Sequence, residues 1–382
     1  MRIGLNLLHA QPNIGGGWNY IANLLAGMAE HAGEHEFVAF VTDASAVIVP
    51  SHPRFRQVRL PVRAASRIQR VLYENVRLPG LARRMRLDVL HWFSNTHAPL
   101  SRTPSAVTVY DLLAFTPAAP WGMVKLAYLR TMIRSTVSSA DMLLPISNAT
   151  AIELRKRLHA NPEQMAVIPS VLPPQFQPVS AARVAEFKQK HALPEHFWLY
   201  VAHFYRHKNH KTLVEAYRQL TSLDRSAAWP LVLRGDGDSG REDTRRQVLE
   251  AGLDGKVLFL PRLDEADLPA LYTGASALVF PSTYEGFGIP VVEAMACGCP
   301  VIAAAQPAVV ESGQDAIWAI DEPTAGAFCD AMRTAQIDAA CRADLSRRGL
   351  ERARHFRSDA VIPHLFEAYA RAARRRDDAA GL

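Results

Sequence analysis

The chain has 382 residues, of which 49% are hydrophobic and 21% charged, with a formal net charge of +6. This length suits two domains of ordinary size, and the composition excludes a disordered or fibrous chain. No apolar run reaches the roughly 18 residues that a membrane-spanning helix needs, and the first ten residues indicate a buried strand rather than a signal peptide. The four cysteines lack zinc-ligand spacing, so we expect reduced thiols in a cytoplasmic protein.

Short apolar runs alternate with longer amphipathic stretches along the whole chain. Such alternation predicts parallel sheets that are covered by helices on both faces. The expected strands are residues 2–8, 36–42, 88–93, 105–113 and 141–147, then 197–203, 230–235, 256–261, 277–282 and 300–304. We therefore expect an α/β protein with two Rossmann-like, doubly wound domains that face a central cleft, where ligands bind beside the carboxyl ends of the strands.

A proline-rich stretch separates the two series of strands. VIPSVLPPQFQPVS, residues 167–180, holds four prolines within ten residues and favours an extended connection. We place the domains at residues 1–178 and 179–355. Residues 356–382 include an amphipathic helical pattern, and we expect this helix to pack back toward the first domain.

The basic charge is concentrated in residues 51–90. This segment carries ten arginines and two acidic residues, Glu74 and Asp88, which gives it a net charge of +8. Such a surface attracts anionic lipid head groups, nucleic acid or a phosphorylated substrate. An arginine-rich, solvated helical surface without a partner is the alternative. Nucleic acid is the least favoured partner, because neither a basic-aromatic motif nor a helix-turn-helix pattern accompanies the charge.

Two carboxylates lie within an otherwise apolar stretch, YEGFGIPVVEAMACGCPVIA. Pro290 fits the first turn of a short helix and Gly298 fits its end, so Glu285 is expected in the preceding loop and Glu293 in or near the first turn. A helix N-terminus binds phosphate, and carboxylates on either side of it would accept hydrogen bonds from hydroxyl groups of the same ligand. A nucleotide sugar has this layout of ribose, diphosphate and sugar. In the alternative, Glu293 stabilises the helix dipole and Glu285 is a turn residue.

EGFGIPVVEAMACGCPVIA resembles the E-x7-E signature of the retaining GT-B glycosyltransferases of family four. The resemblance covers nearly the whole chain and includes YVAHFYRHKNHKTLVEAY, KVLFLPRLDEADLPALYTGASALVFPS, ADMLLPISNAT, MAVIPSVLPPQF and IGGGWNYIANLLAGM. It implies an acceptor-binding first domain and a second domain that binds a nucleotide-sugar donor. Among the relatives, bacterial mannosyltransferase-type enzymes that build surface polysaccharide and lipopolysaccharide are favoured.

The resemblance also implies roles for residues of the second domain. Glu285 should bind hydroxyls of the donor sugar, Glu293 should hold the ribose, and Lys208 should neutralise the donor phosphates. A departing nucleoside diphosphate gains negative charge, which a preorganised cation stabilises; an ordinary solvated lysine is the alternative. The backbone N–H groups of three residues should face the sugar and diphosphate: Gly286, Phe287 and Gly288.

Three further residues near these positions are weaker candidates. His203 stands where the family often has arginine or threonine, and phosphate contact and a neutral wall position are open alternatives. Arg206 could be a second cation or a solvated side chain. Arg262 follows the strand at 256–261, where the family contacts the nucleobase, so we assign it to base contact.

The first domain contributes candidates from two loops. Gly15, Gly16 and Gly17 form an expected loop between strand and helix; the resemblance makes it a wall of the donor-phosphate site, and a flexible turn is the alternative. Asp111 is retained from a family stretch that often reads HDL, but Tyr110 replaces the histidine. Asp111 is therefore a catalytic candidate on the acceptor side, with an N-cap or turn role as the alternative.

The sequence RGDGD places Asp236 and Asp238 in a D-x-D pair, which binds Mn²⁺ or Mg²⁺ in another sugar-transferase fold. Here the pair lies in a glycine-rich loop, where turn chemistry explains it. We expect neither a catalytic metal nor another cofactor besides the co-substrate.

We expect a retaining, metal-independent hexosyltransferase that moves a sugar, with GDP-mannose favoured, to a growing glycan or lipid-diphosphate-linked acceptor. It would be cytoplasmic, and peripheral at the inner membrane face if residues 51–90 meet anionic lipid. UDP- and dTDP-sugars stay open as donors. Other GT-B activities, such as a phosphorylase or an epimerase, are less favoured. From a different class, a catalytically weak or inactive sugar-nucleotide-binding protein is the main alternative.

Overall fold

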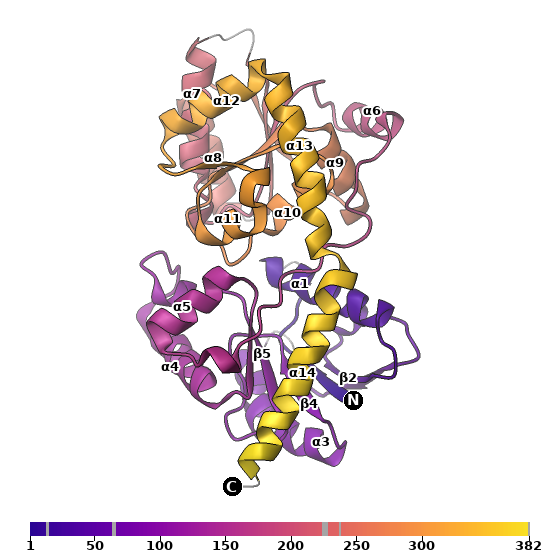
Figure 1. Ribbon diagram of the computed structural model, residues 1–382. Helices are drawn as coiled ribbons and strands as arrows, with labels where there is room; N and C mark the ends of the chain where they lie inside the picture. The colour runs from indigo at the N-terminus through magenta and orange to yellow at the C-terminus, as the bar shows by residue number, and fades with distance from the viewer. Residues whose placement is uncertain (13–14, 63–65, 224–227, 237, 381–382) are drawn as a thin grey trace. The chain divides into compact units, whose positions relative to one another are not determined.

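The computed structural model describes residues 1–12, 15–62, 66–223, 228–236 and 238–380, and these form two compact units (Figure 1). The first unit comprises Met1–Val171 together with Phe356–Leu382, and the second comprises Leu172–His355. The C-terminal segment thus belongs to the unit that the N-terminus begins. Residues 166–180 contain neither helix nor strand, as the proline-rich sequence predicts.

The first unit is built on a parallel sheet that has six strands within the described residues. Its order is β3-β2-β1-β4-β5-β6, which is the doubly wound order of a Rossmann fold. The strands are β1 Arg2–Asn6, β2 Glu36–Val41, β3 Phe55–Arg59, β4 Val89–Trp92, β5 Ser105–Val109 and β6 Met142–Pro145. All five strands predicted in this half are confirmed, and β3 was not predicted. Its sequence FRQVR offers no apolar run, because β3 lies at the sheet edge and is largely exposed.

Helices cover both faces of this first sheet. On one face, Leu78, Ala82 and Ile133 share a core with Leu90 and Trp92 of β4. His91 points to the opposite face, as alternation along a strand requires, and there its Nδ1 lies 2.6 Å from the hydroxyl of Tyr369. The helices are α1 Gly15–Glu30, α2 Arg67–Leu72, α3 Leu78–Arg84, α4 Met123–Ser139, α5 Asn148–Leu158 and α14 Ser358–Ala380, with a π-helical turn, η2 Tyr73–Arg77, between α2 and α3.

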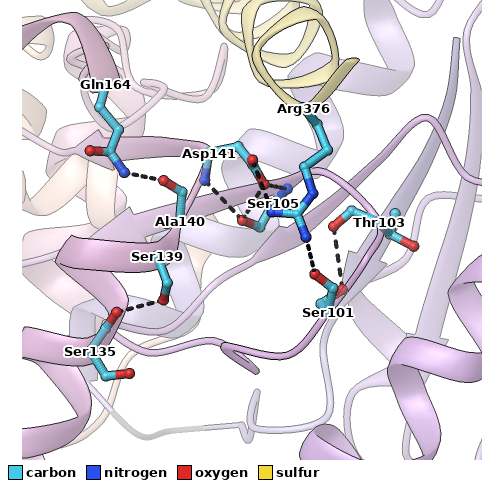
Figure 2. Close-up of polar contacts among 9 residues, drawn as sticks. All are labelled: Ser101, Thr103, Ser105, Ser135, Ser139, Ala140, Asp141, Gln164 and Arg376. Carbon is cyan, nitrogen blue, oxygen red and sulfur yellow. Dashed lines mark hydrogen bonds and ion pairs between the residues drawn. The ribbon is translucent and has the colours of Figure 1, made fainter. Parts of the chain in front are cut away.

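The far end of α14 is tied to the first unit by polar contacts (Figure 2). Arg376 donates to the carbonyl oxygen of Ser101 at 2.8 Å and lies 3.5 Å from the Asp141 carboxylate. The other oxygen of Asp141 accepts from both the backbone N–H and the hydroxyl of Ser105, at 2.8 and 2.9 Å. Asp141 therefore links the start of β5 to α14, and it is a structural residue of this unit.

The second unit repeats the same architecture. Within the described residues its sheet has the order β12-β11-β10-β7-β8-β9, all parallel, which is again a doubly wound arrangement. The strands are β7 Trp198–Val201, β8 Leu231–Arg234, β9 Val257–Leu260, β10 Ala277–Phe280, β11 Val301–Ala304 and β12 Trp318–Ile320. The five predicted strands are confirmed, and the three-residue edge strand β12 was not predicted. The fold class is thus two Rossmann-like α/β units, as expected.

The helices of the second unit cover its sheet. They are α6 Ala181–Lys190, α7 His210–Leu223, α8 Asp238–Glu250, α9 Leu268–Gly274, α10 Ile289–Ala296, α11 Pro307–Gly313, α12 Ala325–Ile337 and α13 Ala339–Ala353. The helix predicted from IPVVEAMAC is confirmed as α10: Pro290 is in its first turn, and Gly298 follows its end with φ +72°. None of the described helices is long and apolar enough to cross a bilayer.

Candidate functional site

Two loops of the second unit meet where its strand order reverses. β7 and β10 are parallel neighbours at the centre of the sheet, and the chain proceeds from them toward opposite edges. Ligands in doubly wound folds bind beside the carboxyl ends of strands at such a point. Lys208 lies in the loop after β7, in the short helix η5 Arg206–Lys208, and Glu285 lies in the loop after β10.

Hydrogen bonds hold these two loops together. The carbonyl oxygen of His207 accepts from the backbone N–H of Thr283 at 2.8 Å and from the Ser282 hydroxyl at 3.2 Å. Asn209, in a left-handed conformation, donates from its side-chain amide to the carbonyl oxygen of Pro281 at 3.2 Å. The geometry of the site is therefore set by the backbone as well as by its charged side chains.

Lys208 and Glu285 form an ion pair across the two loops. Lys208 Nζ donates to Glu285 Oε1 at 2.7 Å, and the two side chains are 17% and 10% exposed. The hydroxyl of Tyr200, on β7, donates to the Lys208 carbonyl oxygen at 2.5 Å. Burial, with a smaller effect of the Glu285 charge, raises the pKa of Tyr200 well above its usual value, so this hydroxyl stays a donor. The sequence prediction that Lys208 and Glu285 share one site is consistent with this geometry.

The N-terminus of α10 follows Glu285 directly. Gly288 occupies the position before the helix with φ +93°, a conformation that side chains rarely adopt. Gly286 and Phe287 lie between Glu285 and this glycine, and Phe287 is buried. The N-terminus of α10, which carries a partial positive charge, therefore begins only four residues after Glu285.

Glu293 lies just past the first turn of α10, which agrees with the predicted position in or near that turn. It is the fifth residue of the helix, because α10 begins at Ile289, so it is in the second turn. Its carboxylate is buried and accepts a hydrogen bond of 2.8 Å from the Tyr272 hydroxyl of α9. Burial raises the pKa of Glu293 to about 7, against the opposing effects of the Tyr272 hydrogen bond and the Arg234 charge. Because burial disfavours its charged form, the helix-dipole role that was the alternative for Glu293 is less favoured.

Arg234 is a site residue that the sequence analysis missed. It ends β8, its Nε is buried without a hydrogen-bond partner among the described residues, and its charge acts on the pKa values of Glu293 and His203. Gly235 follows it, and a Cβ there would clash with the carbonyl oxygen of Ala202. The available signal was an arginine at the carboxyl end of an otherwise apolar strand, PLVLRG.

His203 and Arg262 both lie beside Asp236. His203 Nδ1 is 3.2 Å from the carbonyl oxygen of Asp236, and burial lowers the pKa of this histidine, which favours the neutral ring. Arg262 Nη1 is 4.0 Å from the Asp236 carboxylate, and both side chains are partly exposed. Arg206 is exposed at the start of η5. The roles assigned to His203 and Arg262 stay predictions.

The D-x-D pair is divided between a loop and a helix. Asp236 follows β8 and lies beside Arg262, Asp238 begins α8, and Gly237 between them is outside the described residues. Among the residues that the structure describes, no three His, Cys, Asp or Glu side chains gather as a metal site. The expected absence of a catalytic metal stays a prediction.

The glycine run of the first unit is helical, which corrects the expected loop. Gly15, Gly16 and Gly17 are the first three residues of α1, while residues 13–14, with which the predicted loop begins, lie outside the described residues. A Cβ on Gly17 would lie 3.9 Å from the ring of Tyr110. This is ordinary van der Waals contact, so space alone does not require glycine at position 17, and the donor-phosphate role of the run stays a prediction.

Asp111 has the turn role that was the alternative for it. Its carboxylate accepts from the backbone N–H of Leu113 at 2.9 Å, where the short helix η3 Leu113–Phe115 begins, and its carbonyl oxygen accepts from Asn95 at 3.0 Å. Tyr110, in place of the family histidine, donates from its hydroxyl to the Phe93 carbonyl oxygen at 2.9 Å. The acceptor-side role of Asp111 stays a prediction. Asp111, Gly16 and Gly17 belong to the first unit, and the other candidates belong to the second.

Two family models match the chain and leave little of it uncovered. The model described as Glycosyltransferase Family 4 matches residues 14–175, and the model described as Glycosyl transferases group 1 matches residues 183–352. The O-antigen chain mannosyltransferase B of Escherichia coli is 26% identical over 284 residues, which are 74% of this chain and 74% of that protein. Other curated relatives are longer; the chain covers 52% of one and 20% of another.

Solved structures share the fold over nearly the full length. Sucrose-phosphate synthase from Thermosynechococcus elongatus is 24% identical, with a TM-score of 0.76 over 97% of this chain and 98% of that one. The Anabaena protein HepE, in complex with UDP and glucose, is 16% identical, with a TM-score of 0.76 over 97% and 99% of the two chains. These likenesses establish the architecture independently of the sequence motifs.

Proposed function

The chain is a GT-B glycosyltransferase that resembles bacterial polysaccharide mannosyltransferases, and from this we propose that it transfers a hexose, with retained anomeric configuration, from a nucleotide-activated donor to a growing glycan or lipid-linked acceptor. GDP-mannose is the favoured donor. The observation that carries this proposal is the ion pair of Lys208 and Glu285 at the N-terminus of α10, where the strand order of the second sheet reverses.

The positions of the pair suit the two parts of the donor that are joined by the bond to be broken, the charged diphosphate and the neutral sugar. Lys208 supplies a cation for the diphosphate, and the α10 N-terminus supplies oriented N–H groups for the same negative charge. Glu285, which is paired with Lys208 and precedes α10, accepts hydrogen bonds from the hydroxyl groups of the sugar. As the bond between the sugar and the diphosphate breaks, negative charge grows on the leaving group, so a fixed cation stabilises the transition state more than the ground state. This arrangement would need no metal ion, so we propose a metal-independent reaction.

The nucleoside would lie beside the ends of β8 and β9. Glu293 faces Tyr272 with one carboxylate oxygen, which leaves the other to accept a ribose hydroxyl. Arg262, in the loop after β9, is our candidate for base contact. His203, whose neutral form is favoured by burial because burial lowers its pKa, would form part of the wall.

The donor and the acceptor are proposed on different grounds. The mannosyltransferase relative supports a mannose donor, whereas the HepE structure holds UDP and glucose, so UDP-sugars are the competing class. For the acceptor we propose a lipid-diphosphate-linked glycan, with Asp111 on its side, whereas the glycine run at the start of α1 would form a wall of the donor-phosphate site. Such an acceptor lies at the inner membrane face, and the basic segment 51–90 would hold the enzyme there peripherally.

Incubation with GDP-mannose, UDP-glucose and dTDP-glucose, followed by chromatography of the released nucleotide, tests this function. We expect slow hydrolysis of GDP-mannose without acceptor and faster release when a lipid-linked mannosyl acceptor is added. NMR of the product linkage reports its configuration. Tight nucleotide binding without turnover of any donor would favour the alternative, a catalytically inactive sugar-nucleotide-binding protein.

A further inference from the structure

The surface of one helical segment in the first unit is unusual. α2, η2 and α3 form a continuous helical stretch from residue 67 to residue 84. Its inner side packs on the core through Leu78 and Ala82, which are fully buried, and through Tyr73 and Leu81. A helix that is anchored by one apolar side normally presents polar residues on the other.

The outer side is apolar instead. Ile68, Leu72 and Val76 are 77%, 60% and 68% exposed. They are four residues apart, so they lie on one face of the helical stretch. Single exposed aliphatic side chains are ordinary, but three in a row on one face form a patch that marks an interaction site. We call these three residues the apolar ridge.

Exposed cations accompany the apolar ridge. Arg77, Arg83 and Arg84 are exposed on the same stretch, and Arg86 is exposed just beyond its end. The one acidic residue in the sequence from 66 to 86 is Glu74, whose side chain is only 13% exposed.

Glu74 is turned away from this surface by its partners. Its carboxylate accepts from Asn6 at 2.9 Å and lies 3.8 Å from Arg70 Nε. The outer surface of the segment therefore combines three large aliphatic side chains with at least four arginines. The Glu74 carboxylate points inward, away from this surface. Arg63, which also belongs to the basic segment, lies outside the described residues.

We propose that residues 67–86 dock this protein on an anionic lipid bilayer, with the apolar ridge inserted among the lipids and the arginines at the head groups. Aliphatic residues beside cations on one helix face are what an interfacial helix requires. A second copy of the chain is a poorer occupant, because two such basic surfaces would repel one another. This inference deepens the peripheral attachment in the proposed function by naming the inserted residues, and it does not depend on the donor chemistry.

Insertion of the apolar ridge predicts a different salt dependence of vesicle binding from that of purely electrostatic attachment. Binding by arginines alone disappears as salt screens the head groups, whereas the transfer of aliphatic side chains into lipid persists at high salt. The wild-type protein should therefore sediment with phosphatidylglycerol-containing vesicles at low salt and keep a salt-resistant fraction at high salt. Vesicles of phosphatidylcholine alone should bind it weakly.

Two triple variants separate the contributions. Ile68→Ser with Leu72→Ser and Val76→Ser should remove the salt-resistant fraction and lower partitioning by about tenfold or more. Arg83→Gln with Arg84→Gln and Arg86→Gln should lower partitioning at low salt on the order of 100-fold. The matched control replaces three exposed aliphatic residues of the second unit by serine, namely Leu223, Leu249 and Ile337, which are 62%, 60% and 81% exposed. It should bind like the wild type.

A fluorescent probe tests insertion directly. Cys297, Cys299 and Cys329 are buried, so a Cys341→Ser, Leu72→Cys protein can be labelled at position 72 with an environment-sensitive dye. Its emission should shift to the blue on anionic vesicles and be quenched by lipids brominated on the acyl chain. An unchanged spectrum, or ridge variants that bind like the wild type, would overturn the proposal.

Two further measurements separate lipid insertion from self-association and from donor chemistry. Light scattering should show the same oligomeric state for the wild type and the ridge variant; a change would assign the ridge to a second copy of the chain instead. Donor hydrolysis in solution should be unchanged in the ridge variant. Vesicle binding without any donor hydrolysis would contradict the proposed function and leave this inference standing.

Discussion

The hydroxyl of Tyr272 on α9 donates a hydrogen bond of 2.8 Å to the buried carboxylate of Glu293 on α10. This contact joins two helices of the second unit and fixes the orientation of a carboxylate that burial has made hard to ionise. Burial raises the pKa of Tyr272 well above its usual value, so the hydroxyl remains a donor at all physiological pH values. The Glu293 carboxyl group is therefore the member of this pair whose protonation depends on pH.

The stability of the protein should depend on pH through Glu293. Its pKa is about 7 in the folded chain, against 4.5 for a freely solvated glutamate, so the folded chain binds the proton more tightly than the unfolded chain. The free energy of unfolding therefore falls as pH rises from 4.5 to 7, by about 3 kcal/mol in total. Glu293→Gln removes this fall, and its stability relative to the wild type should improve by that amount across this range. Thermal unfolding at half-unit steps of pH measures it, and parallel curves for the two proteins would contradict the assignment.

Nucleotide affinity should distinguish Glu293 from its partner. Glu293→Ala removes the proposed acceptor of the ribose hydroxyl and should weaken nucleotide binding about tenfold or more. Tyr272→Phe removes only the supporting hydroxyl and should have a smaller effect. Isothermal titration with GDP checks both variants. Unchanged affinity in the alanine variant would exclude the ribose role.

Lys208→Met should weaken binding of nucleoside diphosphates and slow turnover further. The change removes the cation that is proposed for the donor phosphates and leaves the Glu285 carboxylate without its partner. A loss of about 2 to 3 kcal/mol in transition-state stabilisation is expected. Lys211→Met, on the exposed surface of α7, is the matched control. Equal effects of the two substitutions on the rate would show that Lys208 does not act in the reaction.

Chelation should leave the transfer rate almost intact. If Lys208 and the α10 N-terminus balance the charge of the departing diphosphate, excess EDTA removes nothing that the reaction needs. The measurement is the initial rate with and without EDTA, followed by addition of Mn²⁺ or Mg²⁺. A rate that collapses and then recovers with metal would return attention to Asp236 and Asp238.

The stability of the first unit should depend on the buried hydrogen bond between Tyr369 of α14 and His91 of β4. Tyr369→Phe removes the hydroxyl that lies 2.6 Å from His91 Nδ1 and leaves that ring nitrogen without its partner inside the protein. Such a loss costs about 1 to 3 kcal/mol. Hydrogen exchange should increase in peptides from β4 and α14 and stay unchanged in the second unit. Tyr205→Phe, at a half-exposed position of the second unit, serves as the control.

The strands that the sequence predicted are those with buried apolar runs. β10 and β11 are buried at every position, and their sequences, ALVF and VIAA, are continuously apolar. β3 and β12 lie at sheet edges, where FRQVR is largely exposed and WAI is only three residues long. Neither has a pattern that distinguishes it from a loop. Edge strands are specified by their neighbours more than by their own residues.

The loops and the short helix of the candidate site were predictable, but the partners of their side chains were not. Glycine and proline positions predicted both ends of α10, whereas the hydrogen bond between Glu293 and Tyr272 of α9 could not be read from the sequence. The glycine run at 15–17 suggested a loop because glycine disfavours helices, yet it begins α1. Arg234 was missed because a charged residue at a strand end is usually solvated.

The kinetics of Glu285→Gln test the central claim most directly. The substitution keeps the size of the side chain and replaces a carboxylate, 2.7 Å from Lys208 Nζ, by an amide that binds sugar hydroxyls less strongly. Turnover of GDP-mannose and affinity for GDP should be measured on the same preparation. We predict that kcat falls by about 100-fold or more while the Kd for GDP changes little. Near-normal turnover, or a loss confined to nucleotide affinity, would contradict the placement of Glu285 at the donor sugar.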